Sequence, residues 1–220
     1  MANLKLTSTT IFAMLGLPGA GKTYFARQFA DQLDIAHISE DRIRYELFDE
    51  SSYSDQDNRV VGSIGNYMAD EFLARNVSIV YDSENHTKKS RQELVDLAKK
   101  HRAKLLFIWV QTDVNTCMDR ASSRDRRKIE DKYTHEIDEA IFDVYKRNIS
   151  KPEREDYVVI SGKHLFKTQF LTVLRKLRLL NLVELNISTE NVSQTTNKNE
   201  NKKPRVDLGR RMTPSRQNIL

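Results

Sequence analysis

The residues best suited to chemistry lie in one run near the N-terminus that follows the pattern G-x-x-x-x-G-K-T. The run reads Gly16, Leu17, Pro18, Gly19, Ala20, Gly21, Lys22 and Thr23. Its glycines permit backbone conformations that a side chain would forbid, so that successive N–H groups can converge on phosphate oxygens. Lys22 supplies a positive charge for the outer phosphates, and the hydroxyl of Thr23 can ligate Mg²⁺. We therefore expect every position of the run except Leu17 to bind ATP, with Lys22 also catalytic and Thr23 a metal ligand.

The residues on either side of this run decide between a real site and a glycine-rich turn that contains a lysine by chance. An apolar stretch of strand length, Ile11–Leu15, precedes the run. After it, Phe25, Phe29 and Leu33 recur at four-residue spacing, which is typical of one face of a helix. A strand, a glycine loop and a helix N-terminus follow one another in the order that an anion site requires. Both flanks thus favour a nucleoside triphosphate site.

Asp41 and Arg44 follow a second apolar run, Ile35–Ile38. If a helix begins there, the two side chains share a face because they are three residues apart. A carboxylate near the γ-phosphate can accept the proton of an attacking hydroxyl, and an arginine can hold an anionic substrate. Asp41 is therefore a candidate general base and Arg44 a candidate substrate ligand. The alternative is a helix cap beside a surface ion pair.

Asp82 directly follows a third apolar run, Val77–Tyr81. A carboxylate at this point of a phosphate-loop protein can bind Mg²⁺ or the water around it, so Asp82 is the second predicted metal ligand. The next residue is Ser83, and the nearest acid is Glu84, two positions on. An adjacent acid that would polarise water for hydrolysis is therefore missing.

A basic cluster follows a fourth apolar run and a helix expected to start near Asp113. Its members are Arg120, Arg124, Arg126, Arg127 and Lys128. An arginine that closes over the transferring phosphoryl group stabilises the charge that develops there. We expect Arg120 to contact the nucleotide and Arg124 to be catalytic, although any of the four arginines could be the one that closes. A solvated basic helix face is the alternative, because acids are interleaved with the cluster.

Apolar runs alternate with helical patterns along the chain, which predicts an α/β fold. Further strand-like runs are Leu105–Val110 and Tyr157–Ile160, and a closing helix is expected from Leu165 to Leu177. This alternation favours a mostly parallel, five-stranded sheet with helices on both faces, in three layers. Ligands of such sheets bind at the carboxyl ends of the strands, where the candidate residues lie.

The apolar stripes of two further helices can be read from the spacing. One stripe consists of Val60, Ile64, Tyr67, Met68 and Phe72. The other consists of Ile137, Ile141, Val144, Tyr145 and Ile149. Each is expected to face the core.

Charge divides the chain into two parts. Residues 186–220 hold seven Lys or Arg and three acidic residues, which leaves the first 185 residues close to neutral. This segment is rich in Asn, Thr, Ser and Lys and has few apolar residues, so we expect a disordered basic tail at residues 186–220 after a single domain at residues 1–185. The tail could dock a protein or a nucleic acid.

The chain contains one cysteine, Cys117, so no internal disulfide can form. It lies in an apolar helical pattern, where a buried thiol is expected rather than a nucleophile. The N-terminus lacks the apolar stretch of a signal peptide, and no apolar run of membrane-spanning length occurs. These features predict a cytoplasmic protein without a membrane partner.

Four short stretches together resemble the P-loop kinases of the AAA-33 group, which includes polynucleotide 5′-hydroxyl kinases and has zeta-toxin-like and gluconate-kinase-like relatives. They are Gly16–Thr23, the D-x-x-R of Asp41 and Arg44, the strand end Val80–Ser83, and Arg120–Arg124. The resemblance implies a P-loop NTPase fold over about residues 10–182. It also implies that Asp41 activates the acceptor hydroxyl, that Arg44 contacts an acceptor phosphate, and that Arg120 and Arg124 belong to a lid.

The sequence therefore predicts an ATP- and Mg²⁺-dependent kinase that acts on a hydroxyl, with a nucleotide or polynucleotide 5′-hydroxyl among the candidate acceptors. The near-neutral body and the lack of a phosphatase domain argue against a polynucleotide. A GTPase is excluded because the nearest match to N-K-x-D, Asn197–Glu200, lies in the polar tail and ends in Glu. The alternatives are an ATPase, or a non-catalytic module gated by ATP whose tail recruits a partner.

Overall fold

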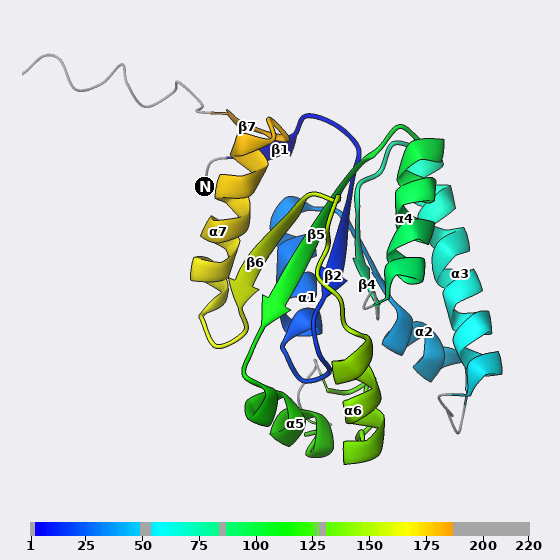
Figure 1. Cartoon of the computed structure of the whole chain (residues 1–220). Coiled ribbons are helices and arrows are strands. Elements are labelled where there is room, and N and C mark those ends of the chain that lie inside the picture. Colours follow the sequence, from blue (N-terminus) through cyan, green and yellow to red (C-terminus); the bar gives the residue numbers. More distant parts are fainter. Residues whose placement is uncertain (1–2, 49–53, 84–86, 126, 128–130, 187–220) are drawn as a thin grey trace, which may run out of the picture. The chain divides into compact units, whose positions relative to one another are not determined.

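Five strands form the parallel sheet that carries the phosphate-binding loop (Figure 1). The computed structural model describes residues 3–48, 54–83, 87–125, 127 and 131–186. The strands of this sheet are β2 (Thr10–Leu15), β3 (Ala36–Ser39), β4 (Ile79–Asp82), β5 (Lys104–Gln111) and β6 (Tyr157–Ser161). Their spatial order is β3-β4-β2-β5-β6, and each neighbouring pair is parallel. The predicted fold class is thereby confirmed.

Helices cover both faces of the sheet. Their bounds are α1 (Lys22–Leu33), α2 (Glu40–Leu47), α3 (Asp55–Ala74), α4 (Lys88–Lys100), α5 (Val114–Ser122), α6 (Glu139–Asn148) and α7 (Phe166–Leu179). Helices α1 and α7 share one hydrophobic cluster with the sheet, and α3 and α4 share the other (Figure 1). The three layers follow from strand alternation, because successive side chains of a strand point to opposite faces.

The central strand β2 shows why both faces must be covered. All six of its residues are buried. Phe12 and Met14 belong to the cluster with α1, where the ring of Phe12 meets that of Phe29 edge to face at 5.0 Å. Ile11 and Ala13 belong to the cluster with α3 and α4. The phosphate-binding loop therefore leaves the sheet from its most buried strand.

The structure corrects the expected buried faces of two helices. In α3, Val60 and Tyr67 are exposed, whereas Val61 and Ala69 are fully buried. The face lies one residue further along because Gly65 and Ala69 let the helix approach the sheet, and a Cβ on Gly65 would come within 2.7 Å of Tyr81 Oη.

Helix α6 shows the same kind of shift. Ile141 and Val144 are exposed, and Phe142 is the buried anchor. Ile137, expected within the helix, is buried but precedes its first residue. Met68 and Phe72 of α3 and Tyr145 of α6 pack against the core as expected, so apolar spacing located both helices and misplaced only part of the side that packs.

A small antiparallel sheet was not expected from the sequence. Strand β1 (Asn3–Leu6) pairs with β7 (Val183–Asn186), with Asn3 opposite Asn186 and Leu6 opposite Val183. Next to the pair, the N–H of Thr7 donates to the carbonyl oxygen of Leu182 at 3.1 Å. The two ends of the described body are therefore hydrogen-bonded to each other.

Some expectations fall on residues outside those described. They concern the basic tail after Asn186, the arginine at 126, the lysine at 128 and the acid at 84. The predicted domain boundary at residue 185 and the role of the tail stay predictions. Among the helices of the described ranges, none is both long and apolar enough to cross a membrane.

Candidate active site

A cleft of about 560 Å³ opens at the carboxyl ends of the parallel strands. Most of the residues singled out by the sequence line it. They are Pro18, Gly19, Gly21, Lys22, Thr23, Asp41, Arg44, Asp82, Arg120 and Arg124. Residues from four separate stretches of the chain are thus brought to one cavity, as expected for a parallel α/β sheet.

Gly16 and Ala20 are the two predicted nucleotide ligands that do not line the cleft, and both shape the loop from behind. Gly16 has a φ of 148°, and a Cβ there would lie 2.5 Å from the carbonyl oxygen of Val110. Ala20 is buried, and its carbonyl oxygen accepts a hydrogen bond from Thr112 Oγ1 at 3.0 Å. The end of β5 therefore supports the loop against which a phosphate would rest.

Lys22 is the first residue of α1, so the helix N-terminus and its unpaired N–H groups face the loop. Gly21 precedes the helix in the left-handed conformation, with a φ of 102°. Lys22 Nζ donates to the carbonyl oxygens of Gly16 at 3.0 Å and Leu17 at 3.2 Å. These contacts hold the ammonium group over the loop, where helix dipole and lysine together favour an anion.

Asp82 is the most unusual carboxylate of the cleft. It is only 5% exposed, and its Oδ2 has no hydrogen-bond partner among the described residues. The nearest cationic candidate is His37, whose Nε2 lies 3.5 Å away, too far for a good hydrogen bond. A buried carboxylate oxygen without a partner is costly unless a cation or water satisfies it. The donor set of Asp82 with the hydroxyl of Thr23 therefore fits Mg²⁺, which binds oxygen ligands and retains waters.

Helix α2 presents Asp41 and Arg44 to the cleft. Ser39 caps its N-terminus by accepting from the N–H of Arg42. The cap is therefore present, and Arg44 is buried instead of lying on the surface. It is 5% exposed, and its Nη2 donates to Asn58 Oδ1 of α3 at 2.7 Å. A guanidinium buried at the wall of a cleft is suited to hold an anion in a defined place.

The structure separates the candidate lid arginines. Arg120 and Arg124 line the cleft, and Arg124 Nη1 donates to Asp131 Oδ1 at 3.0 Å. Arg120 is exposed, and its Nη1 lies 3.5 Å from the carbonyl oxygen of Gly162. Arg127 has a side chain that is 91% exposed and pairs with Asp125 outside the cleft. Of the described arginines in the cluster, only Arg120 and Arg124 can therefore reach a ligand in the cleft.

Several lining residues were not singled out from the sequence. One is Glu40, which accepts a hydrogen bond from Tyr81 Oη at 3.1 Å. Burial, reinforced by the charge of Glu40, raises the pKa of Tyr81 above its ordinary value, so the phenol stays protonated and donates. Asp131 and His164 also line the cleft, in segments without a recognisable motif.

Gly162 could have been found, because it directly follows the last parallel strand. It lines the cleft beside the loop. A Cβ at this position would overlap the carbonyl oxygen of Ala20 and Oγ1 of Thr112. Only glycine therefore allows the end of β6 to approach the phosphate-binding loop so closely.

Cys117 is fully buried in α5, as expected. Burial raises the pKa of its thiol, which keeps it protonated. Its carbonyl oxygen lies where a Cβ on Gly19 would have to be, so the helix packs directly under the loop. The residue therefore supports the loop and is unsuited to nucleophilic chemistry.

Comparison with known proteins agrees with this geometry. The sequence profile of the AAA domain family AAA_33 matches residues 11–152. The L-seryl-tRNA(Sec) kinase of Methanococcus maripaludis is 22% identical over 119 residues, which are 53% of this chain and 47% of that protein. The chain thus spans about half the length of this curated relative.

Solved structures show the same fold at low sequence identity. Kti12 of Chaetomium thermophilum, in complex with ADP-AlF3, superposes with a TM-score of 0.60 at 17% identity, over 79% of this chain and 99% of that one. A gluconokinase of Sinorhizobium meliloti 1021 gives a TM-score of 0.57 at 13% identity, over 80% and 94%. The chain therefore has the fold of P-loop kinases.

Proposed function

We infer that this chain, which belongs to the AAA domain family AAA_33, transfers the γ-phosphate of ATP to a hydroxyl group of an acceptor. The observation that carries the proposal is that nucleotide-side, metal-side and acceptor-side residues line a single cleft. Phosphoryl transfer needs little covalent chemistry from the protein and depends on positioning and charge stabilisation. The cleft offers both.

On the nucleotide side, the backbone N–H groups of Gly19–Thr23 and the N-terminus of α1 would hold the β- and γ-phosphates. Lys22 adds a cation beside the outer phosphates. Thr23 and Asp82 would hold Mg²⁺, which when bound neutralises phosphate charge as the transfer proceeds. The buried, unpartnered oxygen of Asp82 supports this assignment.

On the acceptor side, Asp41 would take the proton of the attacking hydroxyl as it approaches phosphorus. Arg44 would hold an anionic group of the acceptor, since its burial against Asn58 fixes the guanidinium. Arg120 and Arg124 would stabilise the charge that develops on the equatorial oxygens.

The acceptor is a hydroxyl compound that also carries negative charge. A buried arginine at the acceptor end favours a phosphorylated molecule over a neutral sugar. The relative named as a kinase of seryl-tRNA is consistent with this class. A nucleotide or a polynucleotide 5′-hydroxyl is therefore the first acceptor to test, with a nucleic acid partner and a docking role for the basic tail as further proposals.

The proposal is tested by incubating the full chain with γ-labelled ATP, Mg²⁺ and a panel of acceptors. The panel comprises a nucleoside 3′-phosphate, a 5′-hydroxyl oligonucleotide, a seryl-tRNA and gluconate. We expect transfer to at least one anionic acceptor above the water background, and no transfer by the Lys22→Ala variant. Acceptor-free hydrolysis on the order of 10 per second, typical of an enzyme, would favour an ATPase instead. ATP binding without any turnover would favour the gated binding module.

A further inference from the structure

A second groove, separate from the candidate active site, runs along α4 and encloses about 580 Å³. We refer to it as the α4 groove. One wall is the stripe of α4 from Lys88 to Lys99, and the other is the segment of residues 153–156 that leads into β6. Ala103 and Leu105 lie at its end, where β5 begins.

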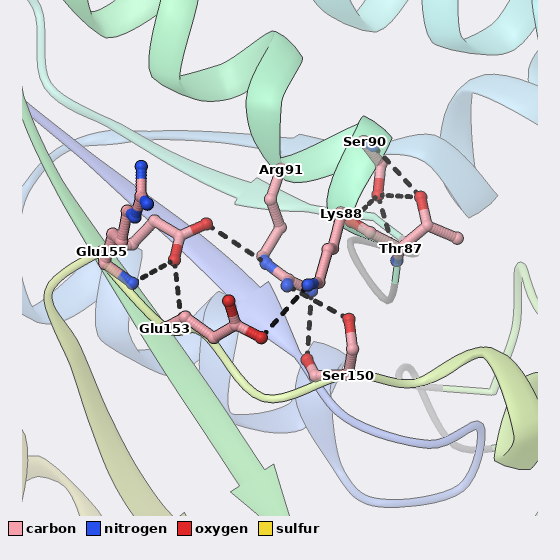
Figure 2. Close-up of polar contacts among 8 residues, drawn as sticks. Thr87, Lys88, Ser90, Arg91, Ser150, Glu153 and Glu155 are labelled. Carbon is pink, nitrogen blue, oxygen red and sulfur yellow. Dashed lines mark hydrogen bonds and ion pairs between the residues drawn. The ribbon is translucent and has the colours of Figure 1, made fainter.

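The second wall is fastened to α4 by Arg91 (Figure 2). The side chain of Arg91 is only 1% exposed and reaches from the helix to Glu155 of this wall and to Ser150, which precedes the wall in the chain. It donates to the carbonyl oxygen of Ser150 at 3.0 Å and to Ser150 Oγ at 3.1 Å, and its Nε lies 3.5 Å from Glu155 Oε1. A buried arginine that spans two segments fixes the width of the groove between them.

The acidic residues of the groove are already engaged within the chain. Glu155 accepts from the backbone N–H groups of Glu153 and Arg154 at 3.0 and 3.1 Å. Burial alone would raise the pKa of Glu155. These N–H donors and the charge of Arg91 outweigh burial and hold the pKa of Glu155 below its ordinary value. Glu153 pairs with Lys88 at 3.1 Å. The third acid, Asp156, pairs with a lysine of α7 at 2.8 Å.

Three cations of the groove are not engaged in this way. The side chains of Arg102, Lys104 and Arg154 make no hydrogen bond or ion pair within the described part of the chain. Arg102 lies just after α4, Lys104 is the first residue of β5, and Arg154 lies on the facing wall. The body of the protein is close to neutral, yet positive charge without a partner collects at this groove.

The floor of the groove is aliphatic. Val95, Ala103 and Leu105 are half-buried there, and Ala98 is buried beneath them. No aromatic side chain lines the groove among the described residues, so bases of a nucleic acid would find no stacking surface. Cations around an aliphatic floor instead complement a chain that alternates carboxylates with aliphatic side chains.

We propose that the α4 groove binds an extended acidic peptide segment of a partner protein. The aliphatic side chains of the peptide would pack on Val95 and Leu105, and its carboxylates would pair with Arg102, Lys104 and Arg154. From Lys88 to Lys100 the helix α4 extends about 18 Å, at about 1.5 Å per residue. An extended peptide of about six residues has the same length. This binding site is independent of the proposed phosphotransfer, because none of its residues lines the catalytic cleft.

The test uses fluorescence anisotropy with the full chain and three labelled probes. The probes are the peptide Asp-Leu-Asp-Leu-Asp-Leu, a peptide of the same length made only of Asp, and a short single-stranded RNA. One triple variant replaces Arg102, Lys104 and Arg154 by Ala. A matched control replaces Arg175, Lys167 and Arg178 by Ala. These side chains are exposed on α7, and their replacement removes the same charge as the groove variant does. Circular dichroism and ATP binding establish that each variant is folded.

We expect the Asp-Leu peptide to bind the unchanged chain and to lose about tenfold or more in affinity in the groove variant, since three charge contacts are removed. The control variant should lose less than about twofold, as exposed charges away from the site contribute little. Val95→Asn should weaken the Asp-Leu peptide and leave the all-Asp peptide unchanged. Absence of Asp-Leu binding, or equal losses in both triple variants, would overturn the proposal. The proposal would also be overturned if the RNA bound more tightly than the peptide and if only the groove variant lost this RNA binding.

Discussion

The two carboxylates proposed for chemistry, Asp41 and Asp82, differ in their surroundings and therefore in what they can do. Asp82 is buried beside the loop with an oxygen that no described group satisfies, which suits a fixed cation. Asp41 is half-exposed at the start of α2, where an acceptor can reach it. A base must meet its substrate, whereas a metal ligand must be held in place.

Replacement of Asp41 by Asn tests its role as general base. The variant keeps the shape of the side chain but cannot accept the proton, so turnover should fall by about 10²–10⁴-fold with ATP affinity little changed. Steady-state kinetics and ATP titration give the two quantities. Unchanged turnover in Asp41→Asn would mean that Asp41 serves the helix N-terminus alone.

Arg44→Lys keeps the positive charge but loses the two parallel N–H donors of the guanidinium. It should raise the KM of an anionic acceptor more than it lowers kcat.

Arg124 and Arg127 form a matched pair for testing the lid. Arg124 lines the cleft, whereas Arg127 pairs with Asp125 in solvent. Arg124→Ala should lower kcat by about 10-fold or more, since its charge is needed mainly in the transition state. Arg127→Ala should leave kcat unchanged. Equal effects of the two substitutions on kcat would contradict the assignment.

At the scale of single residues, the sequence identified those whose role follows from local chemistry. The glycines, Lys22 and Thr23 form one contiguous motif, and Asp82 could be found because it ends an apolar run. Glu40 and Asp131 could not be found, because their place in the cleft depends on how α2 and the segment after α5 pack. A single acid in a polar stretch carries no signal of that packing.

At the scale of elements, the end of β6 and the phosphate-binding loop are fitted to each other at Gly162. Gly162→Ala would force its Cβ against the carbonyl oxygen of Ala20, so the loop must shift. We expect ATP affinity to fall about tenfold, as is typical of overpacking. Gly62 in α3 is the control, because a Cβ there meets nothing within 4 Å. Gly62→Ala should leave ATP affinity unchanged and raise the free energy of unfolding by about 0.5–1 kcal/mol. Calorimetric ATP titration decides whether the two differ.

Asp113 caps the N-terminus of helix α5 and ties the helix to the segment after β6. Asp113 accepts from the N–H of Thr116 at 2.9 Å and pairs with Lys163 at 2.5 Å. Lys163, and then the N–H of Thr116, hold the pKa of Asp113 below its ordinary value of 3.8. A group with a lowered pKa in the folded state stabilises that state above its unfolded pKa, and this stabilisation is lost as the pH falls.

Asp113→Asn should therefore lower Tm at neutral pH, because Asn keeps the cap but loses the charge. The difference from the unchanged chain should shrink from about pH 4 downward, as Asp113 itself becomes protonated. Thermal melts across this pH range measure the effect. A difference in Tm that is constant with pH would exclude the charge of Asp113 as its cause.

The sequence predicted the parallel strands and the order of the elements, because apolar runs and helical spacing are local signals. It misplaced part of the packed faces of α3 and α6, although Met68, Phe72 and Tyr145 pack against the core as expected. In α3 the contact surface is formed partly by Gly65 and Ala69, which leave space for Tyr81 and carry little hydrophobic signal. In α6 one buried aromatic, Phe142, outweighs the aliphatic stripe beside it.

At the scale of the whole molecule, the pair β1–β7 closes the described body. Leu182 stands at this closure, with its carbonyl oxygen bonded to Thr7 and its side chain only 4% exposed. Leu182→Ala should lower the free energy of unfolding by about 2–5 kcal/mol, from lost burial and the cavity left behind. Leu179→Ala is the control, because Leu179 is 80% exposed, and should change it by less than about 0.5 kcal/mol. Urea denaturation measures both, and similar values would show that the closure contributes little.

This strand pair could not be predicted from the sequence. Each strand has four residues, too few for a clear alternation, and their partners lie at opposite ends of the body. Long-range pairing of short segments depends on where the intervening fold places them, and neither segment carries that information.

The pairing of β1 with β7 also has a consequence for synthesis on the ribosome. β1 is made first among the described strands and β7 last. All five strands of the parallel sheet are complete before β7 exists, so the nascent chain can assemble its nucleotide site while β1 still lacks a partner. The joining of these two strands can therefore take place only after translation has passed residue 186.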